Sequence, residues 1–319
     1  GTVDKNVGKV RFWGYEVQAD WNIFAGKDFS WNVGGNISYN MNKVLKLPEN
    51  GNYKNRMNGT LFADDYYAGI GGIAEGERLY SVIGYKVSHI LDNDKAASEA
   101  MYDERAAGYD PTTQTYEKGR KVAGDYEWVD KDGSGTITAK DQFVLGYLVP
   151  TTTGGFNTTV KIKDFEIYAS FDYALGHVIY DRQISLVNSG AQSGYLNPTK
   201  DVLNYWSASG DAAKTRYARF DVEDGSDNGQ WNHYRTSDEN TYKGDYLSFR
   251  ELKVSYNFPR TILNKTQIKA AQVYFSGQNI CCFSQYPGYM TEYSSASRNL
   301  SDGNYPQPRI WTLGLNLTF

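Results

Sequence analysis

The residues best suited to chemistry lie in the twelve-residue segment 130–141, which reads DKDGSGTITAKD. Oxygen-bearing residues occupy loop positions 1, 3, 5, 7 and 12, and glycine occupies position 6, which is the spacing of a calcium-binding loop. Ca²⁺ takes six to eight oxygen ligands, so the chain must wrap tightly around it, and Gly135 permits the sharp turn. The candidate ligands are Asp130, Asp132, Ser134, the backbone carbonyl of Thr136, and Asp141. The pattern predicts a calcium site.

The flanks of this segment favour a structural role for the ion over a sensing role. They lack the pattern of paired helices that flank the loops of calcium sensors. Asp141 also stands where these loops commonly carry Glu, and its shorter side chain makes bidentate ligation harder. A solvated Asp/Gly turn without an ion remains the alternative interpretation.

A second set of candidate residues lies in the long segment 176–245, where aromatic side chains stand among Asn, Asp, Ser and Gly. Aromatic faces beside amides and carboxylates suit polar organic ligands such as sugars or peptides. The candidate ligand-binding residues are Tyr205, Trp206, Trp231 and Tyr234. The alternative is that these rings pack the segment against itself or against a partner.

The sequence contains few of the residue patterns that enzymes use for catalysis. The three histidines are scattered, and neither an HExxH nor a GxSxG motif occurs. The two cysteines, Cys281 and Cys282, are adjacent, which excludes a disulfide scaffold and a cysteine-rich zinc site. The protein is therefore not expected to be an enzyme.

The elements that must position these residues are strands, because apolar and polar residues alternate along most of the chain. From Trp311 to Phe319, for example, Trp, Leu, Leu, Leu and Phe alternate with Thr, Gly, Asn and Thr. In 246–258 the alternation slips by one position, which predicts a β-bulge. Expected strands are 10–24, 29–42, 60–73, 79–91, 154–162, 165–175, 246–258, 271–280 and the last segment to Phe319. These runs are about 10 to 13 residues long, enough for the roughly 9–11 residues that a tilted strand needs to cross a bilayer.

The connections between these strands are unequal in length. Long loops are expected at about 43–59, 92–153, 176–245 and 281–308, and they alternate with short turns. Outer-membrane barrels combine tight periplasmic turns with long extracellular loops. The fold prediction is therefore all-β, a transmembrane antiparallel β-barrel, with about nine strands in this chain. Since nine is odd and bacterial single-chain barrels have even counts, these strands are expected to be the C-terminal part of a larger barrel.

Composition agrees with a barrel and excludes other classes. The net charge of −4 gives no basic field for nucleic acid. Mean hydropathy is −0.60, and no run of about 18 apolar residues occurs, so a transmembrane helix is excluded. The chain nevertheless carries 27 tyrosines, 14 phenylalanines and 7 tryptophans, as expected where one strand face is apolar and the other is wet. The alternative is a soluble or surface-attached, calcium-stabilised β-sandwich that serves as a binding module or adhesin.

Short motifs spread over most of the chain resemble the C-terminal barrel of the SusC/RagA family of TonB-dependent outer-membrane transporters. They include GYEV at 14–17, KDFSW at 27–31, NMNKV at 40–44, GYKV at 84–87, GDYE at 124–127 with the DKDG that follows it, KDF at 163–165, YLSFR at 246–250 and YNFP at 256–259. Phe319, closing an alternating strand, resembles the terminal signal that barrel-assembly machinery reads.

The resemblance implies a barrel of about 22 strands around an N-terminal plug, in the outer membrane of a Gram-negative bacterium. It also implies a TonB-box segment that engages the TonB complex, a SusD-like surface lipoprotein, and import of oligosaccharides or peptides. This sequence contains no plug domain, no TonB box and no first half of the barrel. It is expected to belong to a truncated, split or cleaved transporter whose remaining N-terminal barrel and plug polypeptide lies elsewhere.

Overall fold

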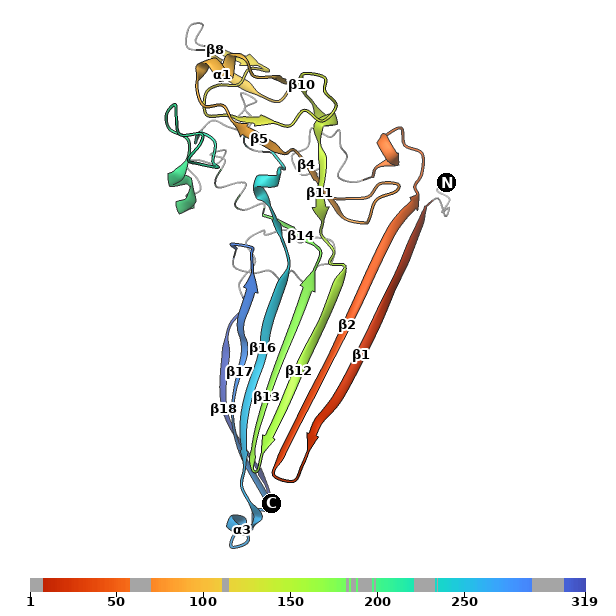
Figure 1. Cartoon of the computed structure of the whole chain (residues 1–319), viewed down its shortest axis with the longest axis vertical. Helices are drawn as coiled ribbons and strands as arrows, with labels where there is room; N and C mark the ends of the chain where they lie inside the picture. Colours follow the sequence, from red (N-terminus) through yellow and green to blue (C-terminus); the bar gives the residue numbers. More distant parts are fainter. Residues whose placement is uncertain are drawn as a thin grey trace, which may run out of the picture.

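The computed structural model describes residues 8–57, 70–110, 115–181, 184, 188, 197, 199–220, 233, 235–288 and 307–319. Its main feature is one seven-stranded sheet in which every neighbouring pair is antiparallel, in the order β1-β2-β12-β13-β16-β17-β18. These strands form a tall wall (Figure 1). They are β1 (Lys9–Ala25), β2 (Phe29–Lys46), β12 (Thr152–Ile162), β13 (Phe165–Leu175), β16 (Tyr246–Asn257), β17 (Ala270–Ser284) and β18 (Ile310–Thr318).

The two faces of the wall differ in polarity, as alternation requires. Cross-strand partners place Phe156, Phe171 and Phe249 on one face, where their rings stack in sequence. The opposite face carries amides, hydroxyls and charges, including the ion pair between Asp172 and Arg250. Large apolar side chains such as those of β18 remain exposed on the apolar face, so the wall encloses no core of its own. This is the pattern of a barrel wall between lipid and a wet lumen.

The β-bulge predicted in β16 is confirmed. Its pairing with β17 shifts between Phe249 and Glu251, and its pairing with β13 shifts at the same height. The extra residue, Arg250, reaches Asp172 on β13 and the side chains of Asn279 and Gln307. The bulge therefore restores the alternation while aiming one guanidinium at the polar face.

Short and long connections lie at opposite ends of the wall (Figure 1). At one end, β1 turns into β2 at Gly26, whose N–H donates to Phe29 O at 2.9 Å, and β12 turns into β13 at Lys163, which has a φ of 52°. The helix α3 (Arg260–Leu263) joins β16 to β17 at the same end. All connections at the other end are long, as the sequence predicts.

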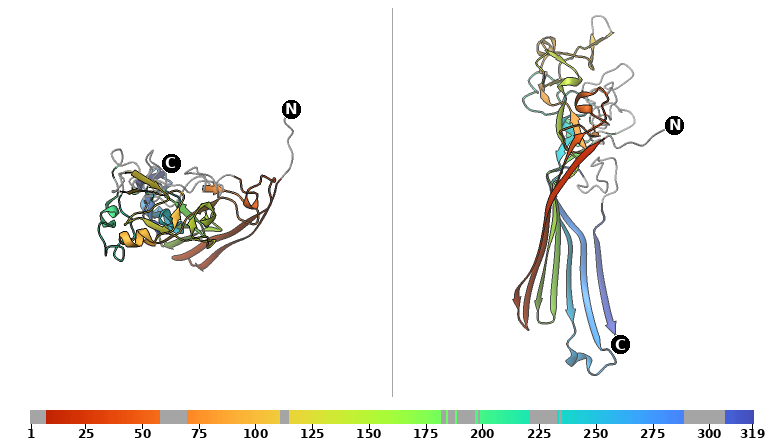
Figure 2. Two further views of the ribbon diagram at one scale, coloured as in Figure 1. Left: turned by 90° about the horizontal axis from the view of Figure 1, so that it is seen from above. Right: turned by 90° about the vertical axis from the view of Figure 1, so that its right-hand side faces the viewer.

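We call the described residues of 47–151 and 176–245 the loop region; they gather beyond the other end of the wall (Figures 1 and 2). Its elements are the helix α1 (Asp94–Ser98), four 3₁₀ turns and eleven short strands. The turns are η1 (Tyr53–Asn55), η2 (Ala139–Asp141), η3 (Lys200–Asn204) and η4 (Asp238–Asn240). The strands are β3 (Ile70–Gly72), β4 (Ser81–Gly84), β5 (Val87–Ile90), β6 (Tyr102–Asp103), β7 (Ala107–Asp110), β8 (Thr115–Lys118), β9 (Tyr126–Trp128), β10 (Thr136–Ile137), β11 (Phe143–Tyr147), β14 (Val178–Tyr180) and β15 (Thr241–Lys243).

The buried core of the described residues lies in this loop region. One cluster comprises Tyr85, Ile90, Tyr126, Trp128, Ile137 and Ala218, and a second comprises Val82, Leu148 and Tyr180. Because the small sheets lie beyond the end of the wall and not over its face, the two-layer sandwich is wrong for the described residues. None of the helices in the described ranges is long and apolar enough to cross a membrane.

Of the two expected wall strands 60–73 and 79–91, the described residues 70–73 and 79–91 are not part of the wall. β2 pairs directly with β12 from Phe29↔Ile162 to Tyr39↔Thr152, so the described sheet has seven strands and not about nine. Residues 60–69 lie outside the described ranges, and 79–91 forms small loop sheets. The reason is burial on both faces: Val82 and Ile83 are adjacent, and both are fully buried.

The expected loop boundaries shift accordingly. The expected loops 43–59 and 92–153 are parts of one long connection, residues 47–151, between β2 and β12. Segment 74–77, which could have been a turn between two wall strands, lies inside this connection. β2 continues to Lys46 and β17 to Ser284, so the loops expected from 43 and 281 begin four residues later.

Candidate calcium loop and aromatic pocket

Three carboxylates of segment 130–141 converge in space. Oxygen atoms of Asp130, Asp132 and Asp141 all lie within 4.8 Å of one another. The loop bends back at Gly133 and Gly135, which have φ values of 72° and 74° that other residues rarely adopt. The sequence pattern therefore brings its three acidic candidates together.

Backbone hydrogen bonds hold Asp130 in this arrangement. Its carboxylate accepts from the N–H groups of Gly133 at 2.7 Å and Gly135 at 2.8 Å, and from that of Ser134 at 3.2 Å. These bonds, that of Gly135 first, lower the pKa of Asp130 below its usual value. The carboxylate is therefore ionised at neutral pH, as a calcium ligand must be.

Asp141 is fully buried and closes the loop from the other side. Its Oδ2 accepts from the N–H of Thr138 at 2.7 Å and its Oδ1 from the N–H of Lys131 at 2.9 Å. Oδ1 also accepts from the Asp132 N–H at 3.4 Å, and Oδ2 from Thr138 Oγ1 at 3.3 Å. The shorter side chain at position 12 is thus held in place by the backbone.

No basic side chain of the described residues forms an ion pair with these three carboxylates. The nearest in sequence, Lys131, directs its Nζ to the carbonyl of Gln142 at 2.6 Å and lies over the ring of Phe143. Ser134 Oγ and the Thr136 carbonyl, the two remaining candidate ligands, are 3.0 Å apart. The set offers hard oxygens and unneutralised negative charge, which fits a divalent cation such as Ca²⁺.

The loop is anchored to the core of the loop region. Ile137 is fully buried in the first hydrophobic cluster, and β10 pairs in parallel with β6. β6 carries Asp103, which is buried and pairs with the buried Arg235 at 2.9 Å. Ordering of segment 130–141 is therefore linked to ordering of the residues around Trp128.

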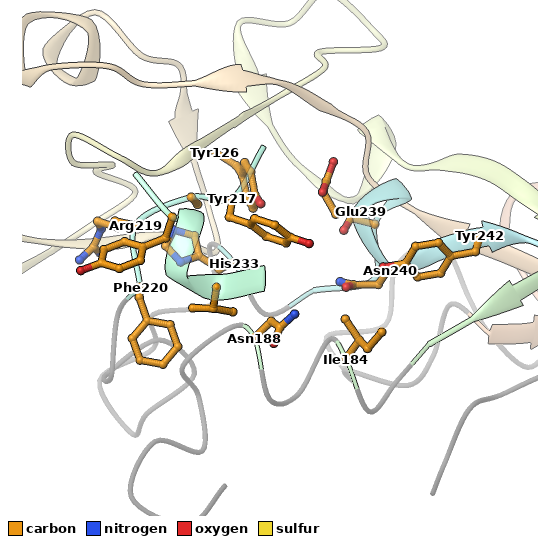
Figure 3. Close-up of a pocket in the computed structure, with 14 residues that line it drawn as sticks. Tyr126, Ile184, Asn188, Tyr217, Arg219, Phe220, His233, Glu239, Asn240 and Tyr242 are labelled. Atoms are coloured by element: carbon orange, nitrogen blue, oxygen red, sulfur yellow. The ribbon is translucent and has the colours of Figure 1, made fainter. Parts of the chain in front are cut away.

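A separate small pocket lies between segment 199–220 and segment 233–242 (Figure 3). Tyr205, one of the predicted ligand-binding residues, lines it, together with Tyr126, Tyr217 and Tyr242. The pocket holds about 40 Å³, enough for a few water molecules and too little for a sugar ring. Burial raises the pKa of Tyr242 to about 12, so its hydroxyl stays protonated.

Trp206, the second predicted ligand-binding residue, is not among the described residues that line this pocket. Trp206 packs against the first hydrophobic cluster and lies directly over Gly124. Trp231 and Tyr234 lie outside the described residues. The rings of Tyr205 and Trp206 therefore lie in different environments, although the two residues are neighbours in sequence.

A buried polar group beside the pocket was not predicted from the sequence. The Asp125 carboxylate accepts from Arg219 Nε at 2.6 Å and lies 3.0 Å from His233 Nε2. Burial alone would raise the pKa of Asp125, but Arg219 and His233 outweigh it and hold that pKa well below its usual range. Arg219 and His233 are 94 and 108 positions from Asp125 in the sequence, so no local motif predicts this group.

Phe319 follows β18 at the short-turn end, and its ring is exposed. Its backbone oxygen accepts from Lys269 Nζ at 3.1 Å, and the Lys269 N–H donates to Thr318 O at 2.7 Å. The last residues of the alternating segment are thus held against the start of β17.

No protein-family model matches the chain. Its curated relatives include TonB-dependent receptor P3 of Formosa agariphila, 27% identical over 333 aligned positions that cover 99% of this chain and 29% of the receptor. Another is TonB-dependent receptor SusC of Bacteroides thetaiotaomicron, 23% identical over 318 positions, with 99% of this chain and 27% of the receptor covered. The chain is similar to part of these TonB-dependent receptors. It spans less than a third of the length of these relatives.

Solved structures show the same fold for this chain. The structure of the RagAB peptide transporter aligns with a TM-score of 0.71 at 20% identity, covering 99% of this chain and 30% of that chain. The RagAB peptide importer in its open-open state gives a TM-score of 0.67. The fold is that of part of an outer-membrane β-barrel. The relatives are receptors and transporters and not enzymes, as the sequence predicts.

Proposed function

We propose that this chain forms part of the barrel wall and the outer loops of a TonB-dependent importer in the outer membrane of a Gram-negative bacterium. The observation that carries the proposal is the seven-stranded wall, whose connections are short at one end and long at the other. The apolar face meets lipid, the polar face lines the solute path, and the loop region lies outside the cell.

The proposed cargo is an oligosaccharide or a peptide. A solved structure with the same fold is that of a peptide transporter, which supports peptides. The resemblance of the sequence to the SusC/RagA family supports oligosaccharides as well. The proposed partners are a SusD-like surface lipoprotein over the loop region, a plug with the remaining barrel strands, and the TonB complex, which supplies energy through the plug. The chain itself provides wall and binding surface and performs no covalent chemistry.

A structural calcium ion is proposed in segment 130–141. Asp130, Asp132 and Asp141 would supply charge, and Ser134 Oγ with the Thr136 carbonyl would supply neutral oxygens. The ion would offset repulsion among three carboxylates that converge without a pairing base in the described residues. Its role would be to stiffen the segment that Ile137 anchors to the core.

Energised uptake tests this function. The receptor that contains this segment is deleted from its host, and uptake of fluorescent oligosaccharides and peptides is measured with and without a protonophore. Loss of uptake of one solute class on deletion, and its block by the protonophore, is the expected result. Unchanged uptake of every probe after deletion would contradict the proposal.

A further inference from the structure

Four basic residues lie together where β1 begins and β2 ends, at the long-loop end of the wall (Figure 1). Arg11 is directly opposite Lys43 in the register of the two strands, and Lys9, two residues further out on β1, is opposite Lys46. All four side chains are exposed. We call Lys9, Arg11, Lys43 and Lys46 the basic cluster.

Strand register assigns the central pair of the cluster to the apolar face of the wall. Gly35 on β2 is opposite Phe156, whose ring lies on that face. Because side chains alternate along a strand, every second residue of β2 from Gly35 to Lys43 shares the face of Phe156. Arg11 shares it as the partner of Lys43. Below Arg11, the same face of β1 carries exposed apolar side chains, namely those of Trp13, Tyr15, Val17 and Trp21.

The apolar band below the basic cluster has the height of a membrane. It runs from the cross-strand pair of Phe24 and Trp31, near the short turns, to the pair of Trp13 and Met41. The ten residue steps from Trp31 to Met41, at roughly 3.3 Å per residue and a tilt of roughly 40°, give a rise of about 25 Å. The apolar band of outer-membrane barrels is also about 25 Å tall. The basic cluster follows directly beyond it, at the level of the lipid head groups.

The basic cluster carries positive charge that the described residues do not neutralise. None of the ion pairs within the described ranges involves its four residues. One carboxylate, that of Glu75, lies near Lys46, and its Oε1 accepts from the Leu47 N–H at 2.7 Å and from the Asn55 amide at 3.1 Å. Like charges directly opposite on neighbouring strands destabilise a sheet. An anion bound at the cluster would offset this repulsion.

The position of the cluster selects the kind of anion. The Arg guanidinium offers a planar fork of N–H donors and each Lys offers three, and both match the oxygens of a phosphate group. Since the face below is apolar, the ligand that fits combines a phosphate with acyl chains. In the outer leaflet of a Gram-negative outer membrane, this lipid is lipopolysaccharide, whose lipid A anchor carries phosphate on a sugar head group with several acyl chains.

We propose that the basic cluster binds the phosphorylated head group of lipid A, with the acyl chains of the lipid along the apolar face of β1 and β2. The inference rests on the proposed function for its orientation, because only then does this end of the wall lie in the outer leaflet. It goes further in assigning a lipid ligand, which takes no part in the solute path.

The test titrates the complete receptor, purified in detergent, with phosphorylated lipid A and measures the bound lipid by native mass spectrometry. Arg11→Gln with Lys43→Gln removes the central pair, and Arg11→Lys with Lys43→Arg conserves its charge. Lys27→Gln with Lys265→Gln is the matched control, since both lysines are exposed in connections at the short-turn end. Heat-modifiable mobility in gels verifies that each variant forms a folded barrel.

The expected result is a Kd for lipid A that rises roughly 10- to 30-fold when the central pair is replaced by glutamines, because each Lys or Arg beside an anionic membrane surface contributes about fivefold. The Kd should be unchanged in the charge-conserving variant and in the control. Lipid A stripped of phosphate should bind the wild-type receptor as weakly as intact lipid A binds the glutamine variant.

An unchanged Kd in the glutamine variant, or an equal loss in the control, would overturn the proposal. Equal affinity of the wild-type receptor for phosphatidylglycerol would overturn the assignment to lipid A. Energised uptake by the wild-type receptor is measured separately, so that a failure of the transport function is distinguished from a failure of lipid binding.

Discussion

The buried ion pair between Asp103 and Arg235 makes the most quantitative prediction. Both side chains are at most 1% exposed, and Arg235 Nη2 lies 2.9 Å from Asp103 Oδ2. The same guanidinium lies 4.8 Å from the ring centroids of Tyr85 and Trp128. Replacing Asp103 by Asn would remove the counter-charge that Asp103 supplies to the buried Arg235. A second guanidinium, that of Arg105, lies close by, and its pKa is lowered by burial and by Arg235.

Removal of one partner of a buried pair typically costs about 3–5 kcal/mol. Since about 1.4 kcal/mol is a factor of ten, the opening equilibrium of the loop core should rise by roughly 10²–10³-fold or more. Hydrogen exchange of the amides of β5, β9 and β10 in the membrane-inserted receptor measures this directly. The wall strands serve as the internal control, because none of their hydrogen bonds depends on Asp103.

A double variant separates charge burial from lost packing. Replacing both residues, Asp103→Leu with Arg235→Leu, removes the uncompensated charge, so protection should recover in large part. The reasoning would be refuted if Asp103→Asn changed the opening equilibrium of the loop core by less than tenfold. It would also be refuted if the double variant showed less protection from hydrogen exchange than Asp103→Asn.

The remaining predictions concern the calcium loop, one glycine and one histidine. Ca²⁺ should protect segment 130–141 from proteolysis relative to EDTA, and Asp132→Asn should abolish the difference; equal digestion with and without Ca²⁺ in the wild type would count against the ion. Gly124→Ala should destabilise the loop region by about 1–3 kcal/mol, because φ is +88° and a Cβ would lie 2.2 Å from the Trp206 ring. Gly133→Ala, with φ of +72° and open space around it, should cost only about 1 kcal/mol in the same chemical denaturation experiment. Burial lowers the pKa of His177 in the folded protein below its usual value of 6.5, although Asp245 acts in the opposite direction. As the pH falls, the unfolded state therefore binds a proton before the folded state does. The local stability around His177 should fall as the pH drops below 6.5. His177→Phe should flatten that pH dependence of hydrogen exchange, and an unchanged slope would show that another group titrates.

The wall strands could be predicted because each carries its own signal. Alternation from Trp311 onward identifies β18, and the slip near Arg250 identifies the bulge, since side chains on a strand face opposite sides at every step. The acidic cluster could be predicted for a similar reason: Asp130, Asp132 and Asp141 lie within one short loop whose spacing sets its geometry.

What could not be predicted depends on contacts distant in sequence. Val82 and Ile83 look like part of a membrane strand, but tertiary packing buries both faces and removes them from the wall. The group of Asp125, Arg219 and His233 has no local pattern.

Residue accessibility across the membrane tests the central claim, that this chain is a barrel wall with its long loops outside the cell, most directly. Cysteine is placed at Glu99 in the loop region or at Asp28 in the β1–β2 turn of the complete receptor, with Cys281, Cys282 and every other native cysteine replaced by serine. A membrane-impermeant maleimide is then applied to intact cells. The account predicts labelling at position 99 in intact cells and at position 28 only after the membrane is opened. Equal labelling of both positions in intact cells would contradict it.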